Sequence, residues 1–226
     1  MSLDELRDLL ERHVRPDLAT AIDGVRVCKV DHAASPVSSM SGTVLAVVAR
    51  GGKRLALGDH VYDYGPGQYL VASVDLPVTG HAINVSPGRP ALGFGMTLEP
   101  AAIAELLLQV GPETLPQARG TVRPGIAVSD APDDLLDAIV RLLRLLDRPQ
   151  DRKALTPLFK REILWRLMTG EQGDTVRQLG FADSNLSHIT RAVRWIRENY
   201  ERPFRVEEVA QLSGMSVSAF TGTSRR

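Results

Sequence analysis

Cysteine is nearly absent from this 226-residue sequence, and other marks of specialised proteins are missing too. The single Cys28 excludes a disulfide within the chain, and no Cys/His cluster has the spacing of a zinc site. No run of about 18 apolar residues occurs, so the sequence predicts no membrane-spanning helix. Lys plus Arg equals Asp plus Glu at 27 each, which leaves no overall basic excess for nucleic acid. Any DNA-binding surface must therefore be local.

Hydrophobic residues make up 43% of the chain, enough to bury a core. Near the N-terminus, Leu3, Leu6, Leu9 and Leu10 recur at helical spacing with acids and bases between them. This pattern predicts an amphipathic surface helix and lacks the unbroken apolar core of a secretory signal, so we expect a cytoplasmic protein. Cys28 lies in the apolar run VRVCKV and is interpreted as a buried small side chain, with a reactive thiol as the alternative.

Residues 1–98 are predicted to form an all-β domain behind the N-terminal helix. The stretch TVLAVVARGGKRLALG indicates a hairpin with its turn at Gly51-Gly52. In YDYGPGQYLVASVDLPVTGHAINV, a turn at residues 65–67 precedes a strand that places Tyr69, Val71 and Ser73 on one face. Short strands at this spacing favour a sandwich or small barrel.

Residues 99–173 are predicted to be helical, which makes the fold class α+β. Helices are expected in EPAAIAELLLQV, APDDLLDAIVRLLRLLD and LTPLFKREILWRLMTGEQG, the last ending at Gly170. The segment PQARGTVRPGIAVSDAP is interpreted as a connection without an element of its own, and residues 174–188 as a polar linker. The apolar helix faces look wide enough for self-association, so we expect a homodimer; the leucines concerned are Leu142, Leu143, Leu145 and Leu146.

Residues 189–226 have the pattern of a helix-turn-helix. Ala210 supplies the small residue of a first helix, Gly214 the turn, and Met215 the apolar residue after it. Ser216 can cap a second helix, which Phe220 would anchor to the core. An ordinary helical hairpin is the alternative.

Basic residues precede this pattern. Arg191, Arg194 and Arg197 recur at every third position, away from an Ile/Val face, where they could contact phosphates. A solvated helix face explains the same spacing.

Three segments together resemble one family, the AraC-type transcriptional regulators. They are YGPGQYLVASVDLPVTG, PLFKREILWRLMTGEQGDTVRQL and HITRAVRWIRENYERPFRVEEVAQLSGMSVSAF. The resemblance extends from about residue 20 to Phe220. It implies a cupin-like β domain that senses a small molecule, helices that pair two subunits, and a DNA-binding domain of two helix-turn-helix units. The DNA-binding residues then expected are Arg191, Arg194, Arg197, Arg205, Ser216, Ser218 and Thr221.

The end of the chain departs from that family pattern, because TGTSRR follows Phe220. Gly222 costs about 1 kcal/mol in a helix interior, and its threonine neighbours are poor helix formers. We therefore expect a regulator cut short within its first helix-turn-helix, with weak or lost specific DNA binding. The alternative is a stand-alone ligand-binding or dimerisation module that acts on a full-length partner.

An effector site is predicted inside the β domain, on the face that carries Tyr69 and Ser73, with His32 and His81 as orienting groups. A metal-dependent cupin enzyme is the alternative, but it needs a His-x-His pair, and here the histidines are scattered singly. A Ser-His-Asp set lacks a nucleophile elbow. We expect no catalytic residues, metal or cofactor, and an unidentified small molecule as ligand.

Overall fold

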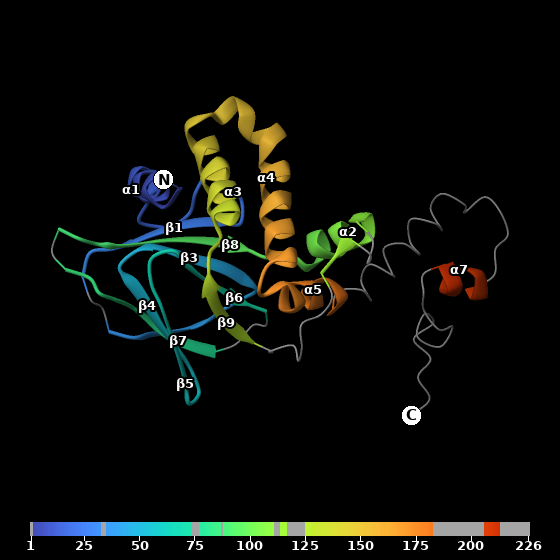
Figure 1. Cartoon of the computed structure of the whole chain (residues 1–226), viewed down its shortest axis with the longest axis horizontal. Coiled ribbons are helices and arrows are strands. Elements are labelled where there is room, and N and C mark those ends of the chain that lie inside the picture. Colours follow the sequence, from blue (N-terminus) through green and yellow to red (C-terminus); the bar gives the residue numbers. More distant parts are fainter. Residues whose placement is uncertain are drawn as a thin grey trace.

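The computed structural model of the chain describes residues 2–32, 35–73, 77–86, 88–110, 114–116, 125–182 and 206–212. The fold is α+β, with helices stacked on one β-sheet and a second sheet beneath it (Figure 1). The elements of the β part are α1 (Ser2–His13), β1 (Val25–Val30), β2 (Val37–Met40), β3 (Val44–Arg50), β4 (Gly52–Leu57), β5 (His60–Tyr64), β6 (Gln68–Ala72), β7 (Pro77–Ile83) and β8 (Ala91–Thr97). They are followed by α2 (Pro100–Val110), β9 (Ile126–Asp130), α3 (Asp133–Arg144), a 3₁₀ turn (Leu145–Asp147), α4 (Pro149–Thr169), α5 (Gly173–Ala182) and α7 (Val206–Leu212).

Two antiparallel sheets form the predicted sandwich. One has five strands in the order β1-β8-β3-β6-β9, and the other has four in the order β2-β7-β4-β5. The prediction of a hairpin at Gly51-Gly52 is wrong, because β3 and β4 belong to different sheets. Gly51 instead turns the chain from one sheet to the other, with φ of +75° and room for no side chain, since a Cβ there would lie 2.7 Å from the Cβ of Ala91. The actual hairpin joins β4 to β5 through Gly58.

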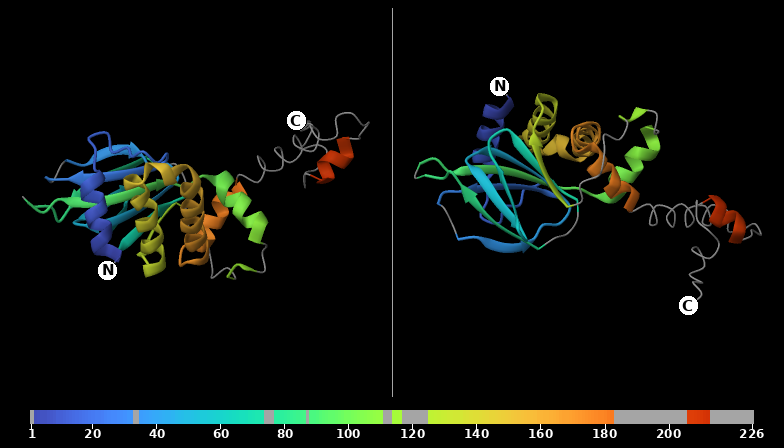
Figure 2. Two further views of the ribbon diagram at one scale, coloured as in Figure 1. Left: turned by 90° about the horizontal axis from the view of Figure 1, so that it is seen from above. Right: turned by 60° about the horizontal axis from the view of Figure 1, so that its bottom comes forward.

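A layer of helices covers the outer face of the five-stranded sheet. There α1, α3 and α4 lie side by side across the strands (Figures 1 and 2). The main core fills the space between, where Leu6, Leu10, Ile139, Leu142 and Ile163 are each 0% exposed. Burying an aliphatic side chain of this size contributes about 1.5–3 kcal/mol, so this layer anchors the fold.

Two segments that were expected to be irregular are ordered elements. Residues 126–130, assigned to a connection without structure, form β9, whose Val128 pairs with Leu70 of β6. Residues 174–182, expected within a polar linker, belong to α5, where Val176 and Leu179 are buried. Both segments are short, and each gains its stability from a neighbour distant in sequence, which local pattern does not reveal.

The leucines that suggested a dimer surface lie within one chain. Leu142, Leu143 and Leu145 are buried in the core between the helices and the sheet, and Leu146 packs against it. The width of the apolar face is therefore explained by the fold of a single chain. In the described part of the chain, no helix is both long and apolar enough to cross a bilayer.

Candidate ligand-binding site

A cavity of about 520 Å³ lies between the two sheets. Small residues face each other across it: Ala91, Gly93 and Gly95 on β8, and Gly80 and Ala82 on β7. Because these positions carry little or no side chain, the two sheets cannot fill the space between them. The cavity thus follows from the alternation of small and large residues along β8. The large residues Leu92, Phe94 and Met96 are on the other face of the strand, in the core under the helices.

Apolar side chains form most of the remaining wall. Leu55, Tyr64, Leu70, Val78 and Ile126 belong to one buried cluster between the sheets, and all of them line the cavity. Strands β1 and β2 are the edges of their sheets.

The edge strands supply the more exposed part of the lining. Arg26 of β1 and Val37 of β2 line the cavity and are exposed. The cavity therefore opens to solvent along these two edges and at Lys53 of the inner strand β4, which is also exposed, and its closed end is the apolar cluster.

A thiol and a lysine from opposite sheets both line the cavity. A Cβ placed on Gly93 would lie 2.8 Å from the Sγ of Cys28, so this thiol occupies the space that the glycine leaves. A Cβ on Gly80 would lie 3.7 Å from the Cε of Lys53, so the lysine stem crosses β7 on the inner face. Burial raises the pKa of Cys28, and the positive charge of Lys53 partly opposes that rise. Lys53 therefore lines the cavity from the four-stranded sheet while remaining exposed to solvent.

Tyr64 completes the polar lining. It is opposite Lys53 in the β4–β5 register and only 3% exposed. Burial strongly raises the pKa of its hydroxyl, and the nearby Cys28 adds to the rise. Tyr64 is therefore an uncharged hydroxyl at the cavity wall at neutral pH.

The positive charges of the lining differ in their partners. Arg50 forms an ion pair with Glu11 and donates a hydrogen bond to the carbonyl of Pro90 at 2.9 Å. Within the part of the chain that the structure describes, neither Arg26 nor Lys53 forms an ion pair, and no Asp or Glu lines the cavity. The cavity thus combines apolar walls with two cations whose charges are not neutralised by a neighbouring carboxylate.

The four predicted effector residues are not brought together in this cavity. Tyr69 is 2% exposed and faces the helices, in the main core. Burial raises the pKa of its hydroxyl, while hydrogen bonds with Ser129 and the backbone of Gln172 oppose the rise. Ser73 exchanges hydrogen bonds with Gly125, its N–H donating to the Gly125 carbonyl at 2.8 Å, and so ties the end of β6 to β9.

The two histidines lie on the outside. His81 is among the cavity-lining residues, but its register partner is Arg54, whose side chain pairs with the exposed Asp63. His81 alternates along β7 with Gly80 and Ala82, which face the cavity, so its side chain is on the outer face of the sheet. His32 is exposed and does not line the cavity. An effector role for Tyr69, Ser73, His32 and His81 remains a prediction.

The predicted DNA-binding residues lie outside the described residues; they are Arg191, Arg194, Arg197, Arg205, Ser216, Ser218 and Thr221. Of the region 189–226, the structure describes α7, a helix where the first helix of the motif was expected, with Ala210 buried. The expected second helix and the effect of Gly222 also fall outside these residues. Over the described ranges, no three His, Cys, Asp or Glu side chains are grouped so that they could hold a metal ion.

Sequence reasoning missed the residues that line the cavity. Three of them, Arg26, Cys28 and Lys53, belong to strands whose sequence pattern gave no sign of a ligand-binding face. The signal that could have revealed them is the segment ALGFGMT at residues 91–97, which alternates small with large apolar residues. Such a strand can fill one neighbouring layer and leave room in the other.

The chain is similar to one protein family in sequence and to several solved structures in fold. Residues 21–175 match the model of a family described as the AraC-type transcriptional regulator N-terminus. A solved structure of fatty-acid-bound ToxT from Vibrio cholerae is similar at 10% identity and a TM-score of 0.42, with 88% of each chain covered. The AraC-like transcriptional activator CuxR is similar at 12% identity and a TM-score of 0.33, covering 96% of this chain and 81% of its own. No curated protein sequence matches the chain.

Proposed function

Because the chain belongs to the AraC-type family of transcriptional regulators, we propose that it controls transcription by binding DNA and that its sandwich cavity holds a small-molecule effector. The observation that carries the effector part is the cavity itself. Its volume of about 520 Å³ lies within the range of small-molecule sites, about 300–1,000 Å³. Such sites are mostly apolar with a few convergent polar groups, as this lining is.

The effector site is tested by filling the cavity. Ala46 lies on the inner face of β3, level with Gly95 and Leu70, and its side chain lines the cavity. We expect native mass spectrometry of the chain, purified from the cells that naturally express it, to detect a bound small molecule. Ala46→Leu should displace it, whereas Leu158→Ala, a change at a side chain 58% exposed on α4, should retain it. A bound mass that survives Ala46→Leu would place the effector elsewhere.

The DNA-binding part of the proposal assigns roles to residues 189–226. Arg191, Arg194, Arg197 and Arg205 would contact phosphates, and Ser216, Ser218 and Thr221 would lie on the recognition helix. Phosphate contacts strengthen binding to every sequence alike, whereas recognition-helix contacts discriminate between bases.

The experiment for this part is selection of bound sequences from a random double-stranded DNA library at about physiological salt. Enrichment of one sequence would support specific DNA recognition by residues 189–226, whereas the sequence pattern of this region predicts that specific binding is weak or lost. Arg194→Ala should weaken binding to all DNA and lower its salt dependence, and Ser218→Ala should change the preferred bases. A chain that enriches no sequence but still binds a ligand would instead be the stand-alone module that acts on a partner.

We further propose that the regulator works as a homodimer, as its family resemblance implies, and that it does so in the cytoplasm, as its N-terminal sequence pattern predicts. Since Leu142, Leu143 and Leu145 are buried within one chain, the contact must use another surface. Sedimentation equilibrium of the purified chain measures the mass directly, and a single-chain mass at micromolar concentration would remove this part of the proposal.

A further inference from the structure

We infer that the effector is an anion joined to an apolar body, such as a hydrophobic carboxylate, and that Lys53 binds its charge. This inference rests on the proposed effector site and adds the chemical class of the ligand. Its basis is the combination of apolar walls, cations without an ion-pair partner among the described residues, and the position of Lys53 at the exposed part of the lining.

The balance of charge in the lining favours an anion. Among the described residues, the lining includes Arg26, Arg50 and Lys53 and no Asp or Glu. Arg50 is already paired with Glu11. Arg26 and Lys53 have no ion-pair partner among the described residues. A cation beside apolar walls gains most from a partner that brings a negative charge, because charge-assisted hydrogen bonds are about twice as strong as neutral ones.

The position of Lys53 sets where the charged group would lie. Its stem passes over Gly80 on the inner face of the four-stranded sheet, and its charge acts on Cys28 in the opposite sheet. Arg26 stands two residues from Cys28 on the same face of β1, about 6.6 Å along the strand. A carboxylate near the open edge could therefore meet Lys53 and Arg26 from facing walls.

The apolar wall sets where the rest of the ligand would lie. Behind the two cations, the cavity is lined by Leu55, Leu70 and Val78 from both sheets. No further described charge lines that closed end, so a second charged group on the ligand would be buried without a partner. The lining thus fits one negative charge at the mouth and an apolar body within.

The experiment compares three probes that share an apolar chain and differ in the head group: decanoate, decanol and decylammonium. Isothermal titration calorimetry with the full chain should show decanoate binding about tenfold or more tightly than decanol. Decylammonium should not bind. Lys53→Gln should weaken decanoate about tenfold and leave decanol unchanged.

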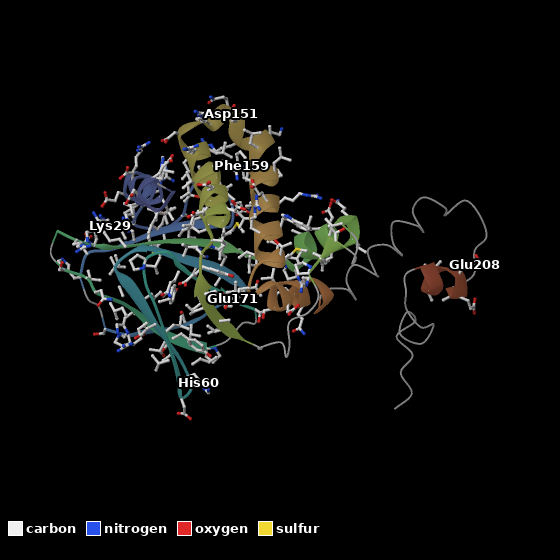
Figure 3. All side chains as sticks on the ribbon, in the orientation of Figure 1. Lys29, His60, Asp151, Phe159, Glu171 and Glu208 are labelled. Carbon is white, nitrogen blue, oxygen red and sulfur yellow. The ribbon has the colours of Figure 1, made fainter. Side chains whose placement is uncertain are left out.

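Lys29→Gln is the matched control. Lys29 is also a β-strand lysine, but it is paired with Asp31 at 3.5 Å, and it lies at the outer end of β1 (Figure 3). This variant should bind all three probes as the parent chain does.

Cys28 provides a second readout because it is the single cysteine of the chain. Decanoate in the cavity should slow the alkylation of Cys28 by iodoacetamide. The rate of alkylation is measured by mass spectrometry. Without ligand, Lys53→Gln should also slow alkylation, because the lysine charge no longer lowers the pKa of the thiol.

The outcomes separate the two proposals. Equal binding of decanol and decanoate, with Cys28 protected by both, would overturn the anion and leave the effector cavity in place. Decanoate binding that Lys53→Gln does not weaken, or that leaves Cys28 unprotected, would overturn the role of Lys53. Failure of decanoate to bind at all would overturn the assigned ligand class. The proposed effector cavity would still be tested separately, by whether Ala46→Leu displaces the small molecule detected by native mass spectrometry.

Discussion

Replacing Gly93 by alanine is predicted to destabilise the fold because of one neighbouring sulfur atom. A Cβ at this position would lie 2.8 Å from the Sγ of Cys28, and the next atom, the carbonyl oxygen of Val47, is 3.5 Å away. The backbone of Gly93 is not among those with positive φ, so alanine meets no conformational obstacle there. The whole cost of Gly93→Ala should therefore come from its contact with Cys28.

The expected magnitude follows from overpacking. An added methyl that forces a neighbour to move costs typically about 1–3 kcal/mol, and because Cys28 can rotate about a single bond we expect about 1–2 kcal/mol. In the background of Cys28→Ala the sulfur is gone, so the same substitution should cost less than about 0.5 kcal/mol. The coupling energy of the double-mutant cycle should then be about 1 kcal/mol or more.

The assay is urea unfolding followed by tryptophan fluorescence, with m-values compared to confirm an unchanged unfolding transition. Gly95→Ala is the matched control on the same strand and face, because a Cβ there would lie 3.8 Å from the Cβ of Arg26, an ordinary contact. Additive effects of Gly93→Ala and Cys28→Ala, or equal costs at Gly93 and Gly95, would refute the assignment of these residues to a shared inner face.

Three further predictions concern the core, the helices and pH. Ile139→Ala should lower the free energy of unfolding by about 2–5 kcal/mol in urea titrations, since the side chain is 0% exposed, whereas Leu158→Ala should change it by less than about 0.5 kcal/mol. Gly180→Ala should speed hydrogen exchange in α2 and α5, because a Cβ there would lie 2.9 Å from α2 side chains; unchanged exchange would contradict this contact. Burial raises the pKa values of Cys28 and Tyr64, so the folded chain holds these protons longer than the unfolded chain. The contribution of these two groups to the free energy of unfolding should therefore be complete below about pH 8.5 and decrease as pH rises beyond it. Tyr64→Phe should make this decrease smaller above about pH 10.

Much of the fold could be predicted from local pattern. The helices at α1, α2 and α3 follow from apolar spacing, and the end of α4 follows from Gly170. The turn at residues 65–67 and the strand after it were also predicted. Each of these elements carries its own signal, in a periodic apolar face or a residue that stops the element.

The arrangement of strands could not be predicted in the same way. A glycine pair between two apolar strands usually marks a hairpin, but Gly51 sits against Ala91 at a corner between sheets. Likewise, β9 depends on its pairing with β6, more than fifty residues earlier in the sequence. Such features are decided by contacts between distant segments, which a single sequence does not display.

The sequence prediction used polarity to choose between the two faces of β6 and selected the face of Tyr69, whereas the cavity borders the face of Leu70 and Ala72. The alternation itself was correct, since Tyr69 and Val71 share one face and Leu70 and Ala72 the other. Both faces are buried, however, so the strand has no solvent side to identify the ligand side. Tyr69 lies in the layer beneath the helices, where its hydroxyl forms a hydrogen bond with Ser129.

Residue size, rather than polarity, distinguishes the two faces of the five-stranded sheet. On β8, Leu92, Phe94 and Met96 fill the layer under the helices, whereas Gly93 and Gly95 leave space towards the second sheet. A shift of one residue in register would exchange these faces and put the glycines under the helices, where the lost core volume would cost several kcal/mol. The requirement for a full helix layer therefore fixes which face of the sheet borders the cavity, and it is this constraint that turns Cys28 and Gly93 towards the second sheet.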